Sequence, residues 1–182
     1  MKTWIQFDNG ATHIALPNGN IIEAELTEED VRVIQKYAKG CYVEIGSKYG
    51  GSAFIAKQKA KEVYAIDPFF QLDNWEGKDY GINFMNKTSI EAARKWKKKI
   101  DVLFIDGDHH HAAQDFGAWE KFVKPGGIIL FHDYADHSEK VIEDCNHGPL
   151  RMKEYKALYV PTVKPRDDTS ILQVQKLSLI HI

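Results

Sequence analysis

Four acidic side chains of this sequence occur where chemistry is favoured in an α/β protein. Each stands in or directly after an apolar run typical of a buried strand: Glu44, Asp67, Asp106 and Asp133. In open α/β sheets, ligands bind outside the carboxyl ends of the strands. We therefore expect these four acids to converge on one crevice.

Two of the acids belong to short polar motifs that suit a metal ion. Asp106 opens the motif Asp-Gly-Asp-His, which also holds Asp108, and Asp133 directly follows His132. If the two motifs face each other across neighbouring strands, their carboxylates suit a hard cation such as Mg²⁺. His132 also admits a softer ion such as Mn²⁺, Fe²⁺ or Zn²⁺. Asp106, His132 and Asp133 are therefore the candidate metal ligands.

The neighbours of these motifs have plainer interpretations as well. As an alternative to metal binding, Asp133 could serve merely as the cap of a helix that follows it. We interpret His110 and His111 as a loop and helix start without a role. His109, which directly follows the acid pair, is a candidate for contact with a substrate.

A glycine-containing loop follows the first of the four acids. Glu44, Gly46 and Gly50 form the pattern E-x-G-x-x-x-G, and Asp67 follows about twenty residues later. Glycines let the backbone turn sharply and approach a nucleotide-like ligand, and an acid in the position of Asp67 can bind ribose hydroxyls. Dinucleotide folds use G-x-G-x-x-G instead. An acid at Glu44 suits a ligand with an amino group better than a phosphate linker. The alternative is a tight turn without a ligand.

This loop and Asp67 resemble motif I and the ribose acid of the class I S-adenosylmethionine-dependent methyltransferases. The passage DVLFIDGDHHHAAQDFGAWEKFVKPGGIILFHDY, residues 101–134, resembles the macrocin-type and other sugar O-methyltransferases, whose fold cephalosporin-hydroxylase-like proteins share. The resemblance covers roughly residues 40–135. It implies that S-adenosylmethionine is bound by Glu44, Gly46, Ser47, Gly50, Asp67, Ser89 and Asp106.

The resemblance also implies roles for the second set of motifs. In the metal-dependent sugar methyltransferases, the first acid of D-G-D and an acid pair after the next strand bind Mg²⁺, and the second acid of D-G-D is the base. In this sequence Asp106 and Asp133 would be ligands and Asp108 the catalytic base. His132 replaces the first acid of the pair. Methyl transfer to a hydroxyl fits such a site, because a metal and a carboxylate base together promote loss of the hydroxyl proton.

The elements that must position these residues follow from periodicity and turn signals. Parallel strands are predicted at 41–45, 63–66, 100–106 and 128–133, and the final strands at 156–160 and 171–177. Helices are predicted from Thr27 to Gly40, from Ser52, from Thr88 to Lys99, at 110–123 and at 138–146, with capping boxes at Thr27/Asp30 and Thr88/Glu91. Pro125-Gly126-Gly127 is interpreted as a turn. The fold class is α/β, a doubly wound Rossmann-like, mostly parallel sheet with an antiparallel C-terminal strand.

Two segments have less regular patterns. Residues 2–25 predict a small N-terminal β-hairpin or meander, which we expect to cover a sheet edge, the alternatives being a ligand lid or a dimer contact. Residues 68–87 are rich in aromatic side chains and predict a lid or acceptor wall, or else a short helix near 80–86. A strand is expected between Phe84 and Ser89.

Composition limits the remaining possibilities. With 182 residues and 43% hydrophobic residues, the chain is expected to form one domain, 1–182. The formal charge of −2 argues against nucleic acid. The basic residues from Arg94 to Lys99 are interpreted as a solvated helix end. No signal peptide or membrane span is expected. Two cysteines, Cys41 and Cys145, favour a reducing cytoplasm. A homo-oligomer is left open.

The sequence thus predicts methylation of an oxygen on a small hydroxylated acceptor, such as a sugar or polyol, with metal assistance. A nicotinamide-dependent oxidoreductase is the alternative enzyme, although G-x-G-x-x-G is missing. A non-catalytic S-adenosylmethionine-binding module is the third interpretation. An HD-type phosphohydrolase, suggested by His132-Asp133, is excluded because that fold is wholly helical.

Overall fold

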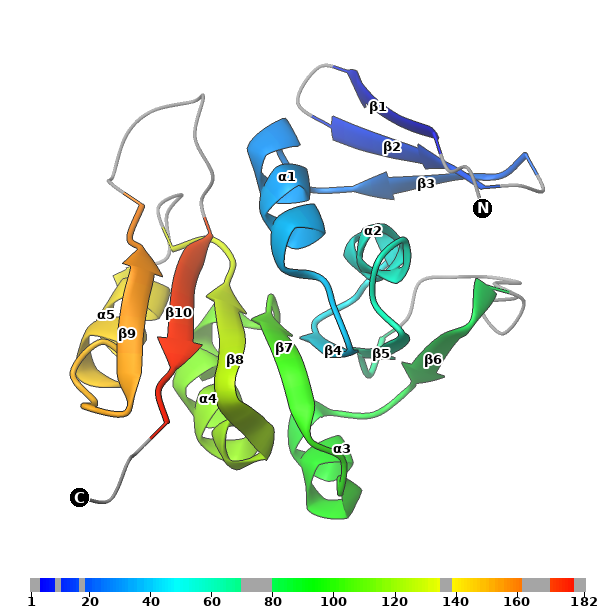
Figure 1. Cartoon of the computed structure of the whole chain (residues 1–182). Coiled ribbons are helices and arrows are strands. Elements are labelled where there is room, and N and C mark those ends of the chain that lie inside the picture. The colour runs from blue at the N-terminus through cyan, green and yellow to red at the C-terminus, as the bar shows by residue number, and fades with distance from the viewer. Residues whose placement is uncertain are drawn as a thin grey trace.

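The computed structural model describes residues 4–8, 11–16, 19–69, 80–134, 139–161 and 171–178. It contains a seven-stranded sheet and a separate three-stranded N-terminal sheet, with helices on both faces of the larger one (Figure 1). Half of the aromatic segment 68–87 that was predicted to be a lid, residues 70–79, lies outside the described residues.

The large sheet has the strand order β6-β5-β4-β7-β8-β10-β9. The five strands from β6 to β8 run parallel, β10 is antiparallel to β8, and β9 is antiparallel to β10. The strand bounds are β4 Cys41–Ile45, β5 Glu62–Ile66, β6 Ile82–Met85, β7 Ile100–Ile105, β8 Val123–Phe131, β9 Tyr155–Tyr159 and β10 Leu172–Lys176. The predicted fold class is therefore confirmed. The strand order reverses beside β4, which is where such sheets bind ligands.

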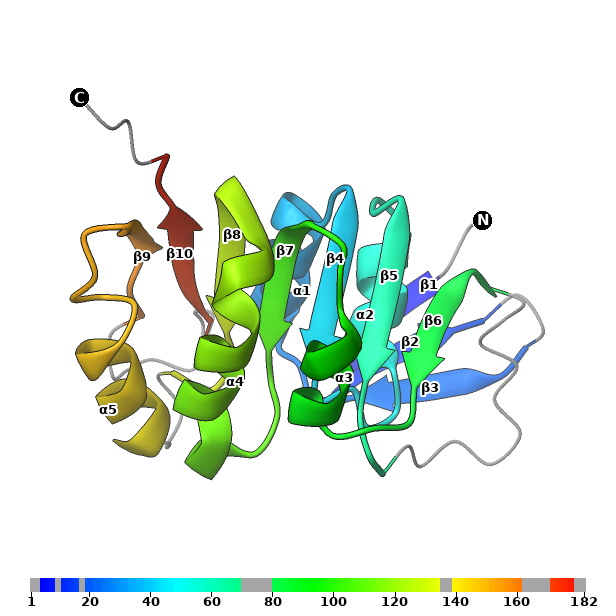
Figure 2. The ribbon, with the colours of Figure 1, turned by 90° about the horizontal axis from the view of Figure 1, so that it is seen from below.

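Helices cover the two faces of this sheet. On one face lie α1 Glu28–Tyr37 and α2 Gly51–Lys57, and on the other lie α3 Ser89–Lys95, α4 Ala112–Trp119 and α5 Glu139–His147 (Figure 2). Neighbouring strand residues point to opposite faces, so Tyr42 packs with α1 and α2 while Val43 packs with the helices opposite. Because the central strands are covered on both sides, they are apolar almost throughout.

The N-terminal sheet comprises β1 Trp4–Asp8, β2 Ala11–Ala15 and β3 Ile21–Ala24, all antiparallel. It packs on α2: a Cβ added to Gly51 would lie 2.5 Å from Cβ of Ala24 and 3.3 Å from Cδ1 of Ile14. The expectation that it covers a sheet edge was therefore wrong. Its apolar face joins the core on the α1/α2 side, because Ile14 and Ile22 are buried there.

Both predicted capping boxes are confirmed, at Thr27/Asp30 before α1 and at Thr88/Glu91 before α3. However, α3 ends at Lys95, so Lys97 to Lys99 follow the helix instead of forming its last turn. Lys98 pairs there with Glu62 at the start of β5.

Three other local predictions need correction. Residues 82–85 form the edge strand β6, so a helix at 80–86 was wrong, and the strand begins before Phe84. The segment Pro125-Gly126-Gly127 lies inside β8, whose pairing with β7 shifts register there, so Gly126 forms an irregularity within the strand instead of a turn before it. The helix predicted at 110–123 is divided into a 3₁₀ turn His109–His111, α4, and a 3₁₀ turn Glu120–Phe122.

No helix in the described ranges combines the length and the apolar character needed to cross a bilayer. Cys41 and Cys145 are both free thiols, and burial raises the pKa of the Cys41 thiol to about 11.

Candidate functional site

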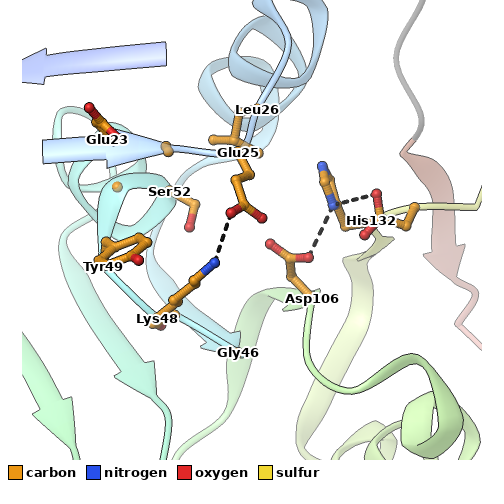
Figure 3. A pocket seen from close by; sticks show the side chains of 13 residues that line it. Glu23, Glu25, Leu26, Gly46, Lys48, Tyr49, Ser52, Asp106 and His132 are labelled. Atoms are coloured by element: carbon orange, nitrogen blue, oxygen red, sulfur yellow. Dashed lines mark hydrogen bonds and ion pairs between the residues drawn. The ribbon is translucent and has the colours of Figure 1, made fainter. Parts of the chain in front are cut away.

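An open pocket lies at the carboxyl ends of β4, β7 and β8 (Figure 3), where about 590 Å³ is free of protein atoms if the space open to solvent is included. Its described lining comes from three parts of the chain. These are the loop after β4 with the start of α2 (Gly46, Ser47, Lys48, Tyr49, Gly51, Ser52), the ends of β7 and β8 (Asp106, His132, Asp133), and the segment that leads from β3 towards α1 (Glu23, Ala24, Glu25, Leu26). A crevice is thus present at the predicted edge of the sheet, but of the four predicted acids only Asp106 and Asp133 are in its described lining, and the N-terminal sheet contributes one wall.

Gly46 brings the first loop against the end of β7. Its φ is +86°, and a Cβ at this position would lie 2.1 Å from the carbonyl oxygen of Asp106 and 2.5 Å from Cα of Gly107. The amide of Gly46 donates to the carbonyl of Ile66, which continues the sheet pairing by one residue. Only glycine combines this dihedral angle with this close approach.

The remainder of the loop is fixed by Asp67. One carboxylate oxygen of Asp67 accepts a hydrogen bond from the amide of Lys48 at 2.8 Å, and the other accepts from the amide of Phe69 at 2.6 Å. Lys48 has a positive φ of 43°, and Gly50, at φ +76°, precedes α2 as its N-cap. Neither Asp67 nor Gly50 is among the described residues that line the pocket, so in this structure they shape the loop around it.

Glu44 is fully buried beneath the loop. One of its oxygens accepts a hydrogen bond from the Ser52 hydroxyl at 2.8 Å, whereas Oε2 has no hydrogen-bond partner among the described residues. Removal from water raises the pKa of Glu44 to about 8. The Ser47 hydroxyl, which lines the pocket, is also buried and makes no hydrogen bond of standard geometry within the described ranges, although it lies near enough to Glu44 to favour the ionised carboxylate. Such orphan polar atoms are uncommon in native proteins and are typical of ligand sites.

Asp106, His132 and Asp133 meet on the opposite side of the pocket. One ligand atom from each lies within 4.8 Å of the others, which is compatible with a shared metal ion. Nδ1 of His132 lies 3.0 Å from an oxygen of Asp106 and 3.2 Å from one of Asp133. Asp133 has a positive φ of 54°, which is unusual for a residue with a side chain. The sequence prediction that these three residues converge is confirmed, whereas their role as metal ligands stays a prediction.

The charges of this cluster are strongly coupled. Burial raises the pKa of the Asp106 carboxyl. Burial disfavours the imidazolium form of His132, but the Asp106 charge and the polar contacts with Asp106, Asp133 and Asp30 together outweigh it and raise the pKa of His132 well above its usual value. Burial acts against ionisation of Asp133 too, yet its contact with His132 lowers the pKa of that carboxyl. The imidazolium therefore supplies a positive charge between two acids.

Asp108, the predicted catalytic base, lies at the turn after β7, and its role stays a prediction. It caps the 3₁₀ turn after β7, where it accepts hydrogen bonds from the amide of His110 and from Nδ1 of His111, both at 2.9 Å. These bonds lower the pKa of its carboxyl, and Asp108 is not part of the described lining. His109 is closer to the cluster, because its Nε2 lies 3.3 Å from an oxygen of Asp133.

The hydroxyl of Ser89 also has a structural partner. It accepts a hydrogen bond of 2.9 Å from the indole nitrogen of Trp119, which is fully buried on α4. Ser89 lies outside the described pocket lining, so its predicted contact with the cofactor stays a prediction.

Sequence reasoning missed several lining residues. Lys48 reaches across the pocket mouth and forms a 2.7 Å ion pair with Glu25, which follows β3 (Figure 3). Tyr49, Ser52 and Glu23 were missed as well. Lys48, Tyr49 and Ser52 belong to the glycine loop and helix start that the motif had marked. Glu23 and Glu25 carry no comparable signal, because they meet the pocket only through tertiary packing.

Comparisons with known proteins agree with this geometry. Residues 43–134, half of the chain, match a family model described as a methyltransferase domain. An uncharacterized protein of Acanthamoeba polyphaga mimivirus is 32% identical over 146 residues, which cover 64% of this chain and 66% of that protein. The chain spans only 13% of a second relative, from Sinorhizobium fredii, at 27% identity over 115 residues.

Solved structures share the fold at low sequence identity. An rRNA methylase from Streptococcus thermophilus has a TM-score of 0.62 and 15% identity, covering 81% of this chain and 94% of that one. An O-methyltransferase from Bacillus cereus in complex with SAH, the demethylated product of S-adenosylmethionine, has a TM-score of 0.58 and 12% identity, covering 84% of each chain. With its strand order and its glycine loop, this chain belongs to the methyltransferase domain family and has the fold of the class I S-adenosylmethionine-dependent methyltransferases.

Proposed function

We propose that this protein binds S-adenosylmethionine in the pocket beside Gly46 and transfers its methyl group to an oxygen of a small hydroxylated acceptor, such as a sugar or polyol. The observation that carries the proposal is the close approach of Gly46 to the backbone of Asp106. A side chain at residue 46 would prevent this approach, so the loop keeps its present form only with a glycine there. The unpartnered Ser47 hydroxyl and Glu44 oxygen offer polar atoms to the amino-acid end of the cofactor, directly or through water.

Charge also favours this cofactor over a nicotinamide dinucleotide. The pocket is lined by the carboxylates of Glu23, Glu25, Asp106 and Asp133. Lys48 and His132 are its basic residues within the described lining. An acidic pocket attracts a sulfonium and an ammonium group and repels a pyrophosphate. The proposal therefore places the ribose near Asp67 and the cationic part of the cofactor among these acids.

The proposed reaction requires a proton acceptor in the chain. As the acceptor oxygen bonds to the methyl carbon and the carbon–sulfur bond breaks, the hydroxyl proton must leave. A divalent ion held by Asp106, His132 and Asp133 would lower the pKa of that hydroxyl. The resemblance assigns the base to Asp108, although the hydrogen bonds from His110 and His111 make its carboxylate a weaker base in this structure.

Calorimetric titration with SAH tests the cofactor proposal. Asp67→Ala should weaken binding by roughly 1.5–3 kcal/mol, the usual loss for a hydrogen bond to a charged group. Asp67→Asn is the matched control for the loop, because its amide oxygen can still accept from one of the two amides. Binding of NAD in place of SAH would overturn the proposal in favour of the oxidoreductase alternative. SAH binding without turnover of any hydroxylated acceptor would favour the non-catalytic module.

Metal dependence is tested separately. Asp133→Ala should lose both metal binding and turnover, and Asp108→Asn should keep the metal and lose turnover. Metal binding should weaken as the pH falls, because the ligands must be deprotonated. Full activity in excess chelator would refute the metal role. Full activity of Asp108→Asn would instead exclude Asp108 as the base. His109, which contacts Asp133, would then be the next candidate for that role.

The remaining expectations also stand as proposals. We place the protein in a reducing cytoplasm, in keeping with its two free thiols, and assign it neither a nucleic-acid nor a membrane partner.

A further inference from the structure

Asp30 is a buried acid that the methyltransferase motifs do not include. It lies in the first turn of α1, outside the residues 43–134 that match the family, and only 1% of its surface is exposed. One of its oxygens accepts hydrogen bonds from the amide and the hydroxyl of Thr27, at 2.9 and 2.7 Å. The same oxygen lies 3.6 Å from Nε2 of His132.

Helix capping alone does not account for the burial of this carboxylate. The second capping box of the chain, Thr88/Glu91, has the same pattern of hydrogen bonds, yet Glu91 is exposed. Capping therefore needs no buried acid. Burial of a carboxylate is unfavourable unless a positive or hydrogen-bonding group compensates it. His132, itself only 7% exposed, is such a group.

Three acids surround the imidazole of His132, although neither ring nitrogen makes a hydrogen bond of standard geometry with a described residue. Asp30 faces Nε2, and Asp106 and Asp133 face Nδ1. The ring of Phe104 packs against it with 5.9 Å between ring centroids and an interplanar angle of 78°. Asp106 and Asp133 thus lie beside Nδ1, and Asp30 lies beside Nε2. This arrangement defines which of the two nitrogens turns towards the pocket.

We propose that Asp30 is a positioning residue that fixes the imidazole of His132, with a proton on Nε2 directed at α1 and Nδ1 directed at Asp106 and Asp133. Histidines that bind metals almost always direct their second nitrogen at a carboxylate, a carbonyl or a water, which sets the tautomer and the ring orientation. Helix α1, which precedes the methyltransferase motifs, thereby adds a third acid to the two that these motifs place around His132. The metal-related part of this inference rests on the proposed function, whereas the orientation of the ring does not.

The experiment compares Asp30→Asn with Thr27→Val. Asp30→Asn retains an oxygen for the bonds from Thr27 and removes the charge that faces Nε2, whereas Thr27→Val disrupts the capping box and retains the carboxylate. Calorimetry with Mn²⁺ alone should show 10- to 100-fold weaker binding for Asp30→Asn and near wild-type binding for Thr27→Val. Thermal unfolding should show a lower melting temperature for Thr27→Val. Glu91→Gln, at the exposed box, should leave metal affinity unchanged.

A second readout needs no metal. In ¹⁵N NMR of histidine-labelled, metal-free protein, the Nε2 proton of His132 should exchange slowly in the wild type and in Thr27→Val, and quickly in Asp30→Asn. Unchanged exchange and shift in Asp30→Asn would overturn the proposal. If the wild type binds no Mn²⁺, the proposed metal role fails and this measurement alone decides the role of Asp30. Should Asp30→Asn not fold, Asp30→Ser keeps a capping oxygen and serves in both measurements.

Discussion

Gly46 combines a positive φ with a Cβ position that is blocked by the backbone of Asp106 and Gly107. Gly46→Ala must place a methyl group 2.1 Å from the carbonyl oxygen of Asp106 at a φ of +86°. The dihedral angle alone costs about 1–2 kcal/mol for a residue with a side chain. The backbone contact adds to this, because neither β4 nor β7 can move aside in a packed sheet. We expect a loss of stability well beyond 2 kcal/mol, measured by urea unfolding, and loss of SAH binding.

Gly126 provides the matched control for this prediction. It has a similar φ of +78°, but a Cβ there would meet nothing within 4 Å. Gly126→Ala should therefore show only the dihedral cost of about 1–2 kcal/mol and normal SAH binding. Equal losses in the two variants would show that the approach of Gly46 to Asp106 is not the limiting constraint.

Glu44 should make stability depend on pH. Its pKa is raised from 4.5 to about 8 in the folded state, so between these values the folded protein keeps a proton that the unfolded chain releases. The contribution of Glu44 to the free energy of unfolding should then be greatest below pH 4.5, fall as the pH rises towards 8, and level off above it, by about 1.4 kcal/mol for each unit of pKa shift. Glu44→Gln should have a shallower slope in chemical unfolding measured across the range, because the raised pKa of His132 contributes a slope of the same sign. A wild-type slope that persists in Glu44→Gln would assign it to other groups.

At the level of elements, the hydrogen bond between Ser89 on α3 and Trp119 on α4 allows a test of whether Ser89 has a structural role or contacts the cofactor. Ser89→Ala leaves the buried indole N–H of Trp119 without its acceptor, which should cost about 1–3 kcal/mol of stability. Because the hydroxyl oxygen is already engaged, we expect SAH affinity to change little. Ser89→Thr keeps a hydroxyl and is the control. A large loss of SAH affinity with unchanged stability would support the cofactor contact that the resemblance implies.

The elements themselves were predictable wherever a local pattern was strong. The uninterrupted apolar runs at β4, β5 and β7 and the capping boxes of α1 and α3 each lie within a few consecutive residues. β6 was expected a few residues too late because it is a four-residue edge strand with the polar Asn83 inside it, and its ladder to β5 is a long-range contact. The extent of β8 was missed because Pro125 and two glycines usually end a strand, whereas an irregularity accommodates them here.

At the scale of the whole molecule, the N-terminal sheet is part of the core. Ile14 on β2 is fully buried against the α1/α2 side, so Ile14→Ala should lower the free energy of unfolding by about 2–5 kcal/mol. Ile21 on β3 is 65% exposed, and Ile21→Ala should stay within about 0.5 kcal/mol of the wild type. Urea unfolding of both variants measures the difference. A small effect of Ile14→Ala would mean that this sheet is a loosely attached extension.

The sequence alone determined the parallel core, the glycine turn at Gly46 and the convergence of Asp106 with Asp133, because each is encoded locally or follows from the rule that ligands meet the carboxyl ends of parallel strands. Only the tertiary structure decided that Asp30 faces His132, that Glu25 reaches Lys48 across the pocket mouth, and that Asp108 turns towards His110 and His111. The first two contacts join segments that are distant in the sequence, and the third depends on a local 3₁₀ turn in place of a regular helix start. No periodicity specifies which polar side chains face one another once the sheets and helices have packed, since that is set by the packing itself.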